Sequence, residues 1–469
     1  MLAALGERST ILFYMRAAML PLFAIVIVCT YLVALRLYSQ RVALWSAVLL
    51  SLWPSFFLKS LEYRTDNAWT ALWMVALLVV VSAPPSPRRW FIAGLVLGCA
   101  FAVSLKTVLL IITLVGGGVI TRYVHRDKTP FGSSAGAALG GLVIVPAIVA
   151  SYFIAVGAWP NLVYCVFTFN TLIEKTRPPA TLEHVLWPLA IAAIVLVARR
   201  HPQSDFRRMF CAVALAVFSV TLIGFWILIS PRDMLPIMPL GAMFAVAAFD
   251  RFEDRVTIYA IAAVVLVASL FYYAGRFRNG TEEFVTMMNQ TLRLTRPGEP
   301  IMDLKGETIY RPRPFYFIFE LITHEAIEKG LIADRVPEAV VAAHCYVAEA
   351  DGRLFPPRAR AFLNEYFLDL GRLRAAGDWV DSDGMFSIAV PGRYIVINDK
   401  GAVGGTLDGS TYNAPRELGS GDHKFFASTP NQRLAVLWAP AFERGFSPFH
   451  LQDRNFRYRG HRLHSRRFR

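Results

Sequence analysis

Charged side chains border or interrupt the apolar stretches of this chain at four places within residues 1–275. Glu62-Tyr-Arg64-Thr-Asp66 precedes one apolar stretch, Lys106 interrupts another and Arg232 opens a third. A charge at membrane depth is costly, so such residues are candidates for function. Carboxylates can act as general bases or bind a metal, and the cations can bind a phosphate. For Glu62–Asp66, a helix cap with an arginine that reaches the membrane interface explains the pattern as well.

The fourth place is the loop 157–184, the longest between apolar stretches, which carries Lys175 and Arg177. Aromatic residues such as Trp159 and Phe169 stand in the same loop. Aromatic residues interleaved with cations suit an interfacial helix that meets a lipid-borne phosphate. A plain amphipathic helix at the membrane interface accounts for the pattern equally well, so both interpretations stay open.

The composition indicates that membrane helices must position these residues. Of the 469 residues, 55% are hydrophobic and 17% are charged, whereas about 25% are charged in a soluble domain. This composition excludes an ordinary soluble enzyme and a disordered protein. The five cysteines form no CxxC pair, which argues against a disulfide framework or a zinc site. No nucleotide loop or nucleic-acid signature is visible, so we expect no cofactor and no nucleic-acid partner.

Ten apolar stretches come near the length of about 20 residues that crosses a bilayer. They are 11–35, 42–58, 66–83, 90–105, 107–121, 134–156, 185–198, 207–229, 233–249 and 256–274. Basic residues favour the cytoplasmic side, and the loops on one side hold thirteen of them against eight on the other. The sequence therefore predicts a multi-pass inner-membrane protein, surrounded by membrane lipids, with the region after residue 274 in the periplasm.

The composition changes after Arg276, and the expected fold is an α-helical polytopic membrane protein followed by a soluble α/β plus β-sandwich domain. The expected parts are a membrane core at 1–275, a small outer α/β domain at 276–380, a small β-sandwich at 381–445 and a basic tail at 446–469. Among the outer elements, Ala339–Val347 is predicted as a strand and Pro314–Lys329 as a helix. Asp381-Ser-Asp383 matches a metal-binding DxD pair, but the following glycine favours a turn. A divalent metal there stays an alternative.

Three motifs taken together resemble a known family. They are Tyr63-Arg64-Thr-Asp66, the run from Arg88-Arg89-Trp90 to Gly98 that ends near Lys106, and Ser230-Pro231-Arg232-Asp233-Met234-Leu235-Pro236. Their order resembles GT-C glycosyltransferases, in the branch of protein O-mannosyltransferases and lipid A aminoarabinose transferases. The resemblance covers about residues 1–275. It implies transfer of a sugar from a polyprenyl-phosphate donor to a glycan, lipid or protein acceptor on the outer face of the membrane.

The resemblance also implies roles for individual residues. The donor phosphate and its cavity would be lined by Arg64, Lys106, Lys175, Arg177 and Arg232. The family's catalytic acid stands in the first outer loop, which this sequence does not contain before Met1. Two interpretations of this departure stay open: either the start of the gene is assigned too late, or the chain is an inactive remnant. Asp66 and Glu62 are the candidates to substitute for the missing acid.

Two other functions fit parts of the pattern. A non-catalytic polytopic protein that partners envelope polysaccharide or glycan assembly would also carry many spans and an outer domain. A transporter would tend to show two related halves with paired broken helices, and no such symmetry is visible in the sequence. An acidic residue in an outer loop upstream of Met1 would favour the enzyme over the non-catalytic partner.

Overall fold

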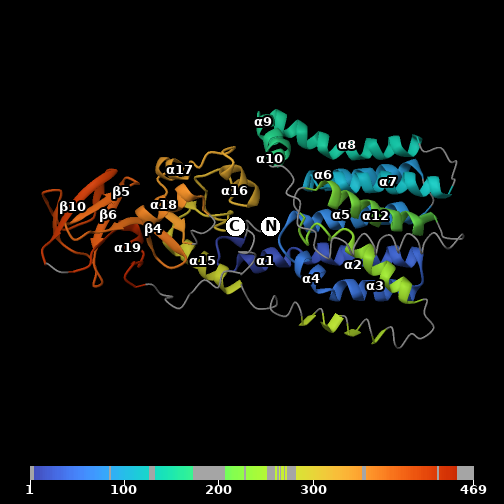
Figure 1. Ribbon diagram of the computed structural model, residues 1–469, viewed down its shortest axis with the longest axis horizontal. Helices are drawn as coiled ribbons and strands as arrows, with labels where there is room; N and C mark the ends of the chain where they lie inside the picture. The colour runs from blue at the N-terminus through green and yellow to red at the C-terminus, as the bar shows by residue number, and fades with distance from the viewer. Residues whose placement is uncertain are drawn as a thin grey trace. The chain divides into compact units, whose positions relative to one another are not determined.

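The structure, a computed structural model, describes residues 5–83, 86–125, 132–172, 206–226, 229–250, 281–350, 355–429 and 432–450, with short pieces between 259 and 271. The chain forms two compact units (Figure 1). The membrane unit comprises residues 13–278, and the second unit, which we call the outer unit after its expected location, comprises residues 279–469 together with 1–12. The start of the chain therefore belongs to the outer unit, which the sequence did not predict.

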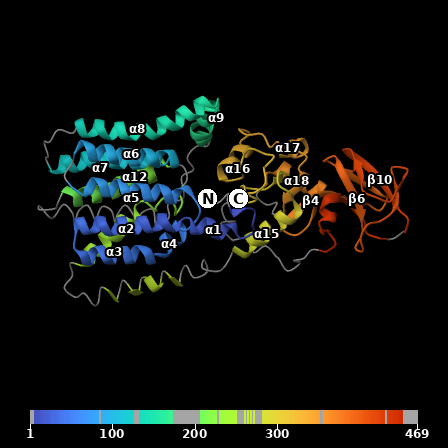
Figure 2. The same ribbon diagram turned by 180° about the vertical axis from the view of Figure 1, so that it is seen from behind.

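The membrane unit consists of helices, most of which run side by side in both views (Figures 1 and 2). They are α1 (Ile11–Ala17), α2 (Leu20–Leu37), α3 (Gln40–Leu52), α4 (Pro54–Ser60), α5 (Thr65–Val81), α6 (Pro87–Val103), α7 (Thr107–His125), α8 (Gly132–Ala155), α9 (Trp159–Val163), a π-helical turn (Tyr164–Thr168), α10 (Phe169–Thr171), α12 (Phe206–Phe225) and α13 (Met238–Phe249). Their interior is apolar and includes the fully buried rings of Trp69, Trp73 and Phe218.

Four of the described helical segments are long and apolar enough to cross a membrane: Ile11–Leu37, α7, α8 and α12. A fifth span results if α3 and α4, which meet at an angle of 68°, form one broken span. Pro54 explains this bend, because proline lacks the N–H that would continue the helix. The expected number of about ten spans is not confirmed. The stretch 185–198 and most of 256–274 lie outside the described residues.

Helices α6 and α8 approach each other through glycine. A Cβ atom on Gly94 would collide with the backbone of Ala138, and one on Gly141 would collide with the backbone of Phe91. Small residues permit such close approach between membrane helices. The neighbouring Gly140 of α8 would meet nothing within 4 Å. The four-residue glycine spacing in α6 therefore serves helix packing, whereas Gly140 does not.

The outer unit combines short helices with two sheets. The helices are α15 (Thr281–Leu294), α16 (Leu321–Glu328), α17 (Val336–Ala342), α18 (Pro357–Tyr366) and α19 (Ala439–Glu443). The strands are β1 (Ile301–Met302), β2 (Val347–Glu349), β3 (Phe367–Asp369), β4 (Leu373–Trp379), β5 (Met385–Ile388), β6 (Gly392–Ile397), β7 (Gly405–Leu407), β8 (Ser410–Tyr412), β9 (Arg416–Leu418), β10 (Gly421–Ala427) and β11 (Ala435–Trp438). One sheet has the order β1-β2-β4-β11-β6-β9 with β3 also paired to β4, and the other has the order β5-β10-β7-β8.

The expected division at residue 380 does not separate two cores. Strand β11 pairs with β4 on one side and with β6 on the other, so residues before and after 380 share one sheet. A single apolar cluster includes Phe319 and Val340 as well as Ile395 and Phe425. Both segments therefore contribute to one folded body. The tail beyond His450 lies outside the described residues.

Two outer elements differ from the sequence prediction. The segment expected as a strand, 339–347, begins as the end of helix α17, which reaches Ala342, and continues without regular structure until β2 begins at Val347. Pro337 stands in the first turn of α17, a position where proline favours a helix start. The helix expected from Pro314 begins at Leu321 instead. Asp381 and Asp383 lie in a turn, where the Gly384 N–H donates to the Asp381 carbonyl.

Candidate active site

Lys106 lies between two buried carboxylates at one end of the membrane helices. Its Nζ atom is 2.8 Å from Asp66 Oδ1 and 2.5 Å from Asp233 Oδ1. Asp66 and Asp233 are only 4% and 1% exposed. Buried carboxylates are costly unless they are paired, so Lys106 stabilises both. Arg64 adds a second cation beside Asp66, with 3.4 Å between Arg64 Nε and Asp66 Oδ2.

Glu62 forms a second bridge between two cations. Lys59 Nζ lies 2.6 Å from Glu62 Oε1, and Arg232 Nε lies 2.6 Å from Glu62 Oε2. The Asn67 amide also donates to the backbone carbonyl of Glu62, at 2.5 Å. The carboxylate is thus held on both oxygens, and the residue is fixed through its backbone as well.

Three separate segments position these side chains. Asp66 stands in the first turn of α5, where the helix dipole favours a negative charge. Lys106 occupies the short break between α6 and α7, and its N–H donates to Ser104 Oγ at 3.3 Å. Asp233 lies in the turn before α13, where its Oδ2 accepts from the Ser230 N–H and hydroxyl at 2.7 and 2.8 Å. Breaks between apolar helices therefore bring polar groups together.

The structure brings together five of the seven residues that the sequence and the resemblance singled out. These are Glu62, Arg64, Asp66, Lys106 and Arg232. The other two, Lys175 and Arg177, lie outside the described residues. The sequence did not single out Lys59 or Asn67. Lys59 stands three positions before Glu62, a spacing at which side chains of opposite charge can pair. This spacing could have identified Lys59 from the sequence.

The charges of this cluster do not balance. It contains four cations and three carboxylates, which leaves one positive charge in excess. The side chains of Arg64 and Arg232 are 44% and 30% exposed, whereas those of Asp66 and Asp233 are 6% and 2% exposed. The accessible side of the cluster therefore presents Arg64 and Arg232 together with Glu62, whose side chain is 26% exposed. Within the described ranges, no three His, Cys, Asp or Glu residues are placed to hold a metal ion.

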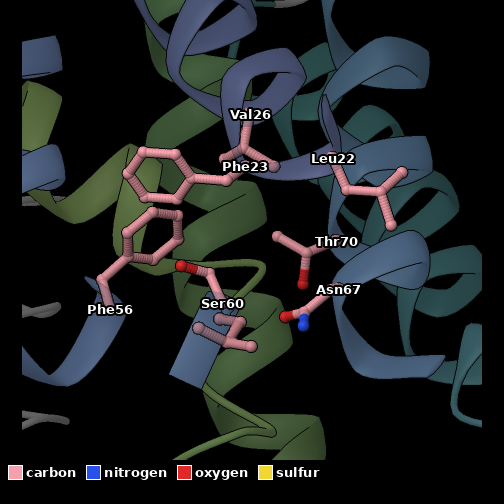
Figure 3. Close-up of a pocket in the computed structure, with 8 residues that line it drawn as sticks. Leu22, Phe23, Val26, Phe56, Ser60, Asn67 and Thr70 are labelled. Atoms are coloured by element: carbon pink, nitrogen blue, oxygen red, sulfur yellow. The ribbon is translucent and has the colours of Figure 1, made fainter. Parts of the chain in front are cut away.

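A small pocket lies beside this cluster, between α2, α4 and α5 (Figure 3). Its walls are mostly apolar, and Ser60, Asn67 and Thr70 supply the polar groups. Thr70 Oγ1 donates to the Asp66 carbonyl at 2.8 Å, and Asn67 holds Glu62. The buried Oδ1 of Asn67 has no hydrogen-bond partner within the described part of the chain. Two polar residues of the pocket, Asn67 and Thr70, thus donate hydrogen bonds to the backbone carbonyls of Glu62 and Asp66.

A separate basic region marks the other end of α5. Arg207 donates to the carbonyl of Val81, the last residue of α5, at 3.1 Å. Arg208 donates to the carbonyl of Leu37 at the end of α2 and stacks over the Tyr38 ring at 4.8 Å. Since a helix rises about 1.5 Å per residue, α5 separates this region from Asp66 by roughly 22 Å. The cluster and the arginine-rich loops therefore lie at opposite ends of the helices, as the alternation of the loops predicted.

Residues 8–152 match the family model described as dolichyl-phosphate-mannose-protein mannosyltransferase. The structure is similar to that of ArnT from Cupriavidus metallidurans bound to undecaprenyl phosphate, with 13% identity, a TM-score of 0.51, and coverage of 72% of this chain and 80% of ArnT. It is also similar to ArnT of the same organism in the apo state, with 13% identity, a TM-score of 0.50, and coverage of 77% and 83%. No curated protein matches the sequence significantly.

The matched segment 8–152 contains Glu62, Asp66 and Lys106 of the cluster, and the similarity in fold extends over most of the chain. This chain therefore has the fold of the similar ArnT structures, and its residues 8–152 resemble in sequence the family of dolichyl-phosphate-mannose-protein mannosyltransferases.

Proposed function

We propose that this protein transfers a sugar from a polyprenyl-phosphate donor to a glycan, lipid or protein acceptor at the outer face of the membrane. The observation that carries the proposal is the excess positive charge of the Lys106 cluster. Arg64 and Arg232 are exposed cations of this cluster. A lipid phosphate is an anion that could approach from the membrane. The similar ArnT structure is bound to undecaprenyl phosphate, which supports this ligand class.

The cations would act on the leaving group. In the proposed reaction, the acceptor hydroxyl attacks the anomeric carbon of the sugar, and the bond from that carbon to the phosphate oxygen breaks. The polyprenyl phosphate leaves with the electron pair and gains negative charge. Fixed cations that meet a developing charge lower the barrier more than flexible ones. Lys106 and its two carboxylates would keep the surrounding charges in place.

Glu62 is the better placed of the two candidate bases. A base must come within hydrogen-bond distance of the hydroxyl whose proton it takes. The side chain of Glu62 is 26% exposed, whereas that of Asp66 is 6% exposed and held by Lys106 and Arg64. However, both Glu62 oxygens bind cations. A donor phosphate that attracts Arg232 would free one Glu62 oxygen, so donor binding would prepare the base.

The same contacts favour a second candidate function. Every carboxylate of the cluster already binds a cation. A protein that only binds the lipid phosphate, without transfer, needs the cations but no free base. Such a protein would correspond to a non-catalytic partner in glycan assembly.

The proposal can be tested by titrating the purified full-length protein with undecaprenyl phosphate and measuring binding by native mass spectrometry. Arg232→Ala is expected to weaken binding by about tenfold or more, as for loss of a charge-assisted contact worth about 1.5–3 kcal/mol. Arg88→Ala is the matched control, since Arg88 is exposed and begins α6 at the opposite end from Lys106. Arg208 is a poorer control because it packs on Tyr38. Equal binding by both variants would contradict the proposed phosphate site.

A further inference from the structure

We propose that Asn67 is a positioning residue for Glu62, and that one water molecule in the small pocket between α2, α4 and α5 binds the side-chain oxygen of Asn67. The proposal rests on the proposed function in one respect, namely that Glu62 competes with a lipid phosphate for Arg232. Asn67 is only 3% exposed and directly follows Asp66 in the first turn of α5. A polar side chain at this burial needs hydrogen-bond partners for both ends of its amide.

One end of the amide holds the segment that carries Glu62. Asn67 Nδ2 donates to the Glu62 carbonyl at 2.5 Å. Glu62 lies between the end of α4 at Ser60 and the start of α5 at Thr65, and its own N–H donates to the Lys59 carbonyl at 3.3 Å. The Asn67 amide therefore ties the Glu62 backbone to α5, whereas Lys59 ties it to α4.

The other end of the amide lies at the pocket. Asn67 Oδ1 is buried and has no hydrogen-bond partner among the residues that the structure describes, and Asn67 lines the pocket together with Ser60 and Thr70 (Figure 3). Both hydroxyls already donate, Ser60 to the Phe57 carbonyl at 3.3 Å and Thr70 to the Asp66 carbonyl at 2.8 Å. Their hydrogens are therefore not available to Asn67 Oδ1, and a buried acceptor without a donor is costly.

The size and chemistry of the pocket identify water as the donor. The pocket offers about 10 Å³ to the centre of a water-sized group, which is about what one water molecule requires. None of the side chains that line it is charged, so a cationic donor would lack a counter-ion there. A water molecule can donate one hydrogen to Asn67 Oδ1 and the other to the oxygen of Ser60 or Thr70, because a hydroxyl that donates can still accept.

An Asn67 side chain that is held at both ends would keep the Glu62 backbone in one place. From that place the Glu62 carboxylate reaches Arg232, with 2.6 Å between Oε2 and Nε. Without the amide, the Glu62 carbonyl would lose its bond to α5, and the ion pair would have to hold a looser segment. Glu62 would then compete less well with a phosphate for Arg232.

Hydrogen exchange of the lipid-free full-length protein tests the positioning role directly. Asn67→Leu has a similar shape but no hydrogen-bonding group, so we expect amide exchange in the segment 61–64 to become several-fold faster. Thr70→Val is the matched control, because it removes a polar group from the same pocket that bonds to Asp66 rather than Glu62. It should leave exchange in this segment unchanged. Equal exchange rates in the Asn67→Leu variant and the natural protein would overturn the proposal.

Binding of undecaprenyl phosphate, measured by native mass spectrometry, tests the consequence for Arg232. Asn67→Leu should bind the lipid several-fold more tightly than the natural protein, because a loosened Glu62 releases Arg232. In a Glu62→Gln background the same substitution should change binding little, since no carboxylate competes there. A merely structural role would instead weaken binding by the same factor in both backgrounds. Asn67→Ser, whose shorter side chain withdraws from Glu62, should behave alike and replaces Asn67→Leu if that variant does not fold.

The outcomes separate this inference from the proposed function. Equal effects of Asn67→Leu in both backgrounds would overturn the positioning role and leave the phosphate site intact. Equal binding by the natural protein and Arg232→Ala would contradict the phosphate site, whereas the exchange measurement would still test Asn67. A density map that resolves waters should show one peak within hydrogen-bond distance of Asn67 Oδ1 and of Ser60 or Thr70. A map without this peak would overturn the assignment of the water.

Discussion

Arg232 and Glu62 form an ion pair with 2.6 Å between Nε and Oε2, although 170 positions separate them in the chain. The pair joins the turn before α13 to the loop before α5. Its side chains are 30% and 26% exposed, whereas Asp66 and Asp233 are buried. Competition between a phosphate and Glu62 for Arg232 is therefore central to the proposed chemistry.

The first prediction concerns Glu62→Gln. Loss of the carboxylate charge frees Arg232, so undecaprenyl phosphate should bind several-fold more tightly. If Glu62 is the base, sugar transfer should fall by about 10²–10⁴-fold. The measurements are native mass spectrometry for binding and transfer to membrane acceptors with a polyprenyl-phosphate sugar supplied. A variant that keeps full transfer activity would remove Glu62 as the base.

The second prediction concerns Arg232→Ala in the same transfer assay. Loss of a fixed cation at the leaving group should reduce transfer by roughly two orders of magnitude, or about 3 kcal/mol. Arg88→Ala should change transfer little, because Arg88 is exposed and begins α6 at the end away from Lys106. Comparable activity of the two variants at matched expression would argue against a catalytic role for Arg232.

The third prediction concerns the stability of the membrane unit. Lys106→Met leaves Asp66 and Asp233 buried without their shared cation, and breaking a buried pair costs about 3–5 kcal/mol. Lys59→Met, whose partner Glu62 is more exposed, should cost at most about 1 kcal/mol. Thermal unfolding in detergent measures both. Adding Asp66→Asn and Asp233→Asn to Lys106→Met should recover part of the lost stability. Equal stability of the Lys106→Met and Lys59→Met variants would contradict the pairing of Lys106 with the two buried aspartates.

The fourth prediction compares two adjacent glycines of α8. Gly141→Ala places a methyl group against the Phe91 backbone and should destabilise the protein by about 1–3 kcal/mol, as overpacking does. Gly140→Ala meets open space and should be neutral or stabilising, since alanine favours a helix over glycine. The readout is the melting temperature of the purified protein. Equal melting temperatures would show that α6 and α8 are further apart.

The fifth prediction concerns pH and the outer unit. Burial alone would raise the pKa of Glu299, but hydrogen bonds from the Arg444 guanidinium and the Arg296 N–H outweigh it, so the pKa lies below its ordinary value. A lowered carboxylate pKa stabilises the folded state above the unfolded pKa of about 4.3, and this stabilisation is lost as the pH falls through the folded pKa. Glu299→Gln should therefore be less stable than the natural protein near pH 6, with a smaller difference at about pH 3.5. A difference that does not change with pH would contradict this assignment.

Much of the membrane unit follows from the sequence because its signals are local. Apolar length predicts a helix that crosses a bilayer, and proline or a charge marks its end, so the charged residues at 62–66, 106 and 232 could be identified as a set. Gly94 and Gly98 of α6 stand four residues apart in the sequence, a spacing of small residues that suits close helix packing, and the structure identifies Gly141 as their counterpart on α8. Residues within one helix need no long-range information.

The outer unit was harder to predict because its strands are short and depend on distant partners. Strands β8 and β9 have three residues each and owe their pairing to β7 and β6. The segment 339–347 contains β-branched residues, which favour strands, yet Pro337 and the packing of Val340 in the core select a helix. Propensity within a few residues could not decide between these outcomes.

The sequence by itself determined the residue types that could bind a phosphate and the apolar stretches that carry them. Only the tertiary structure decided which charges meet: Lys106 with Asp66 and Asp233, and Arg232 with Glu62. It also assigned Glu7 to the outer unit through Arg311, which stands 304 positions later in the chain. The physical reason is that a charge pair depends on distance in space, which the folding of intervening helices sets, whereas helix formation depends on neighbours along the chain.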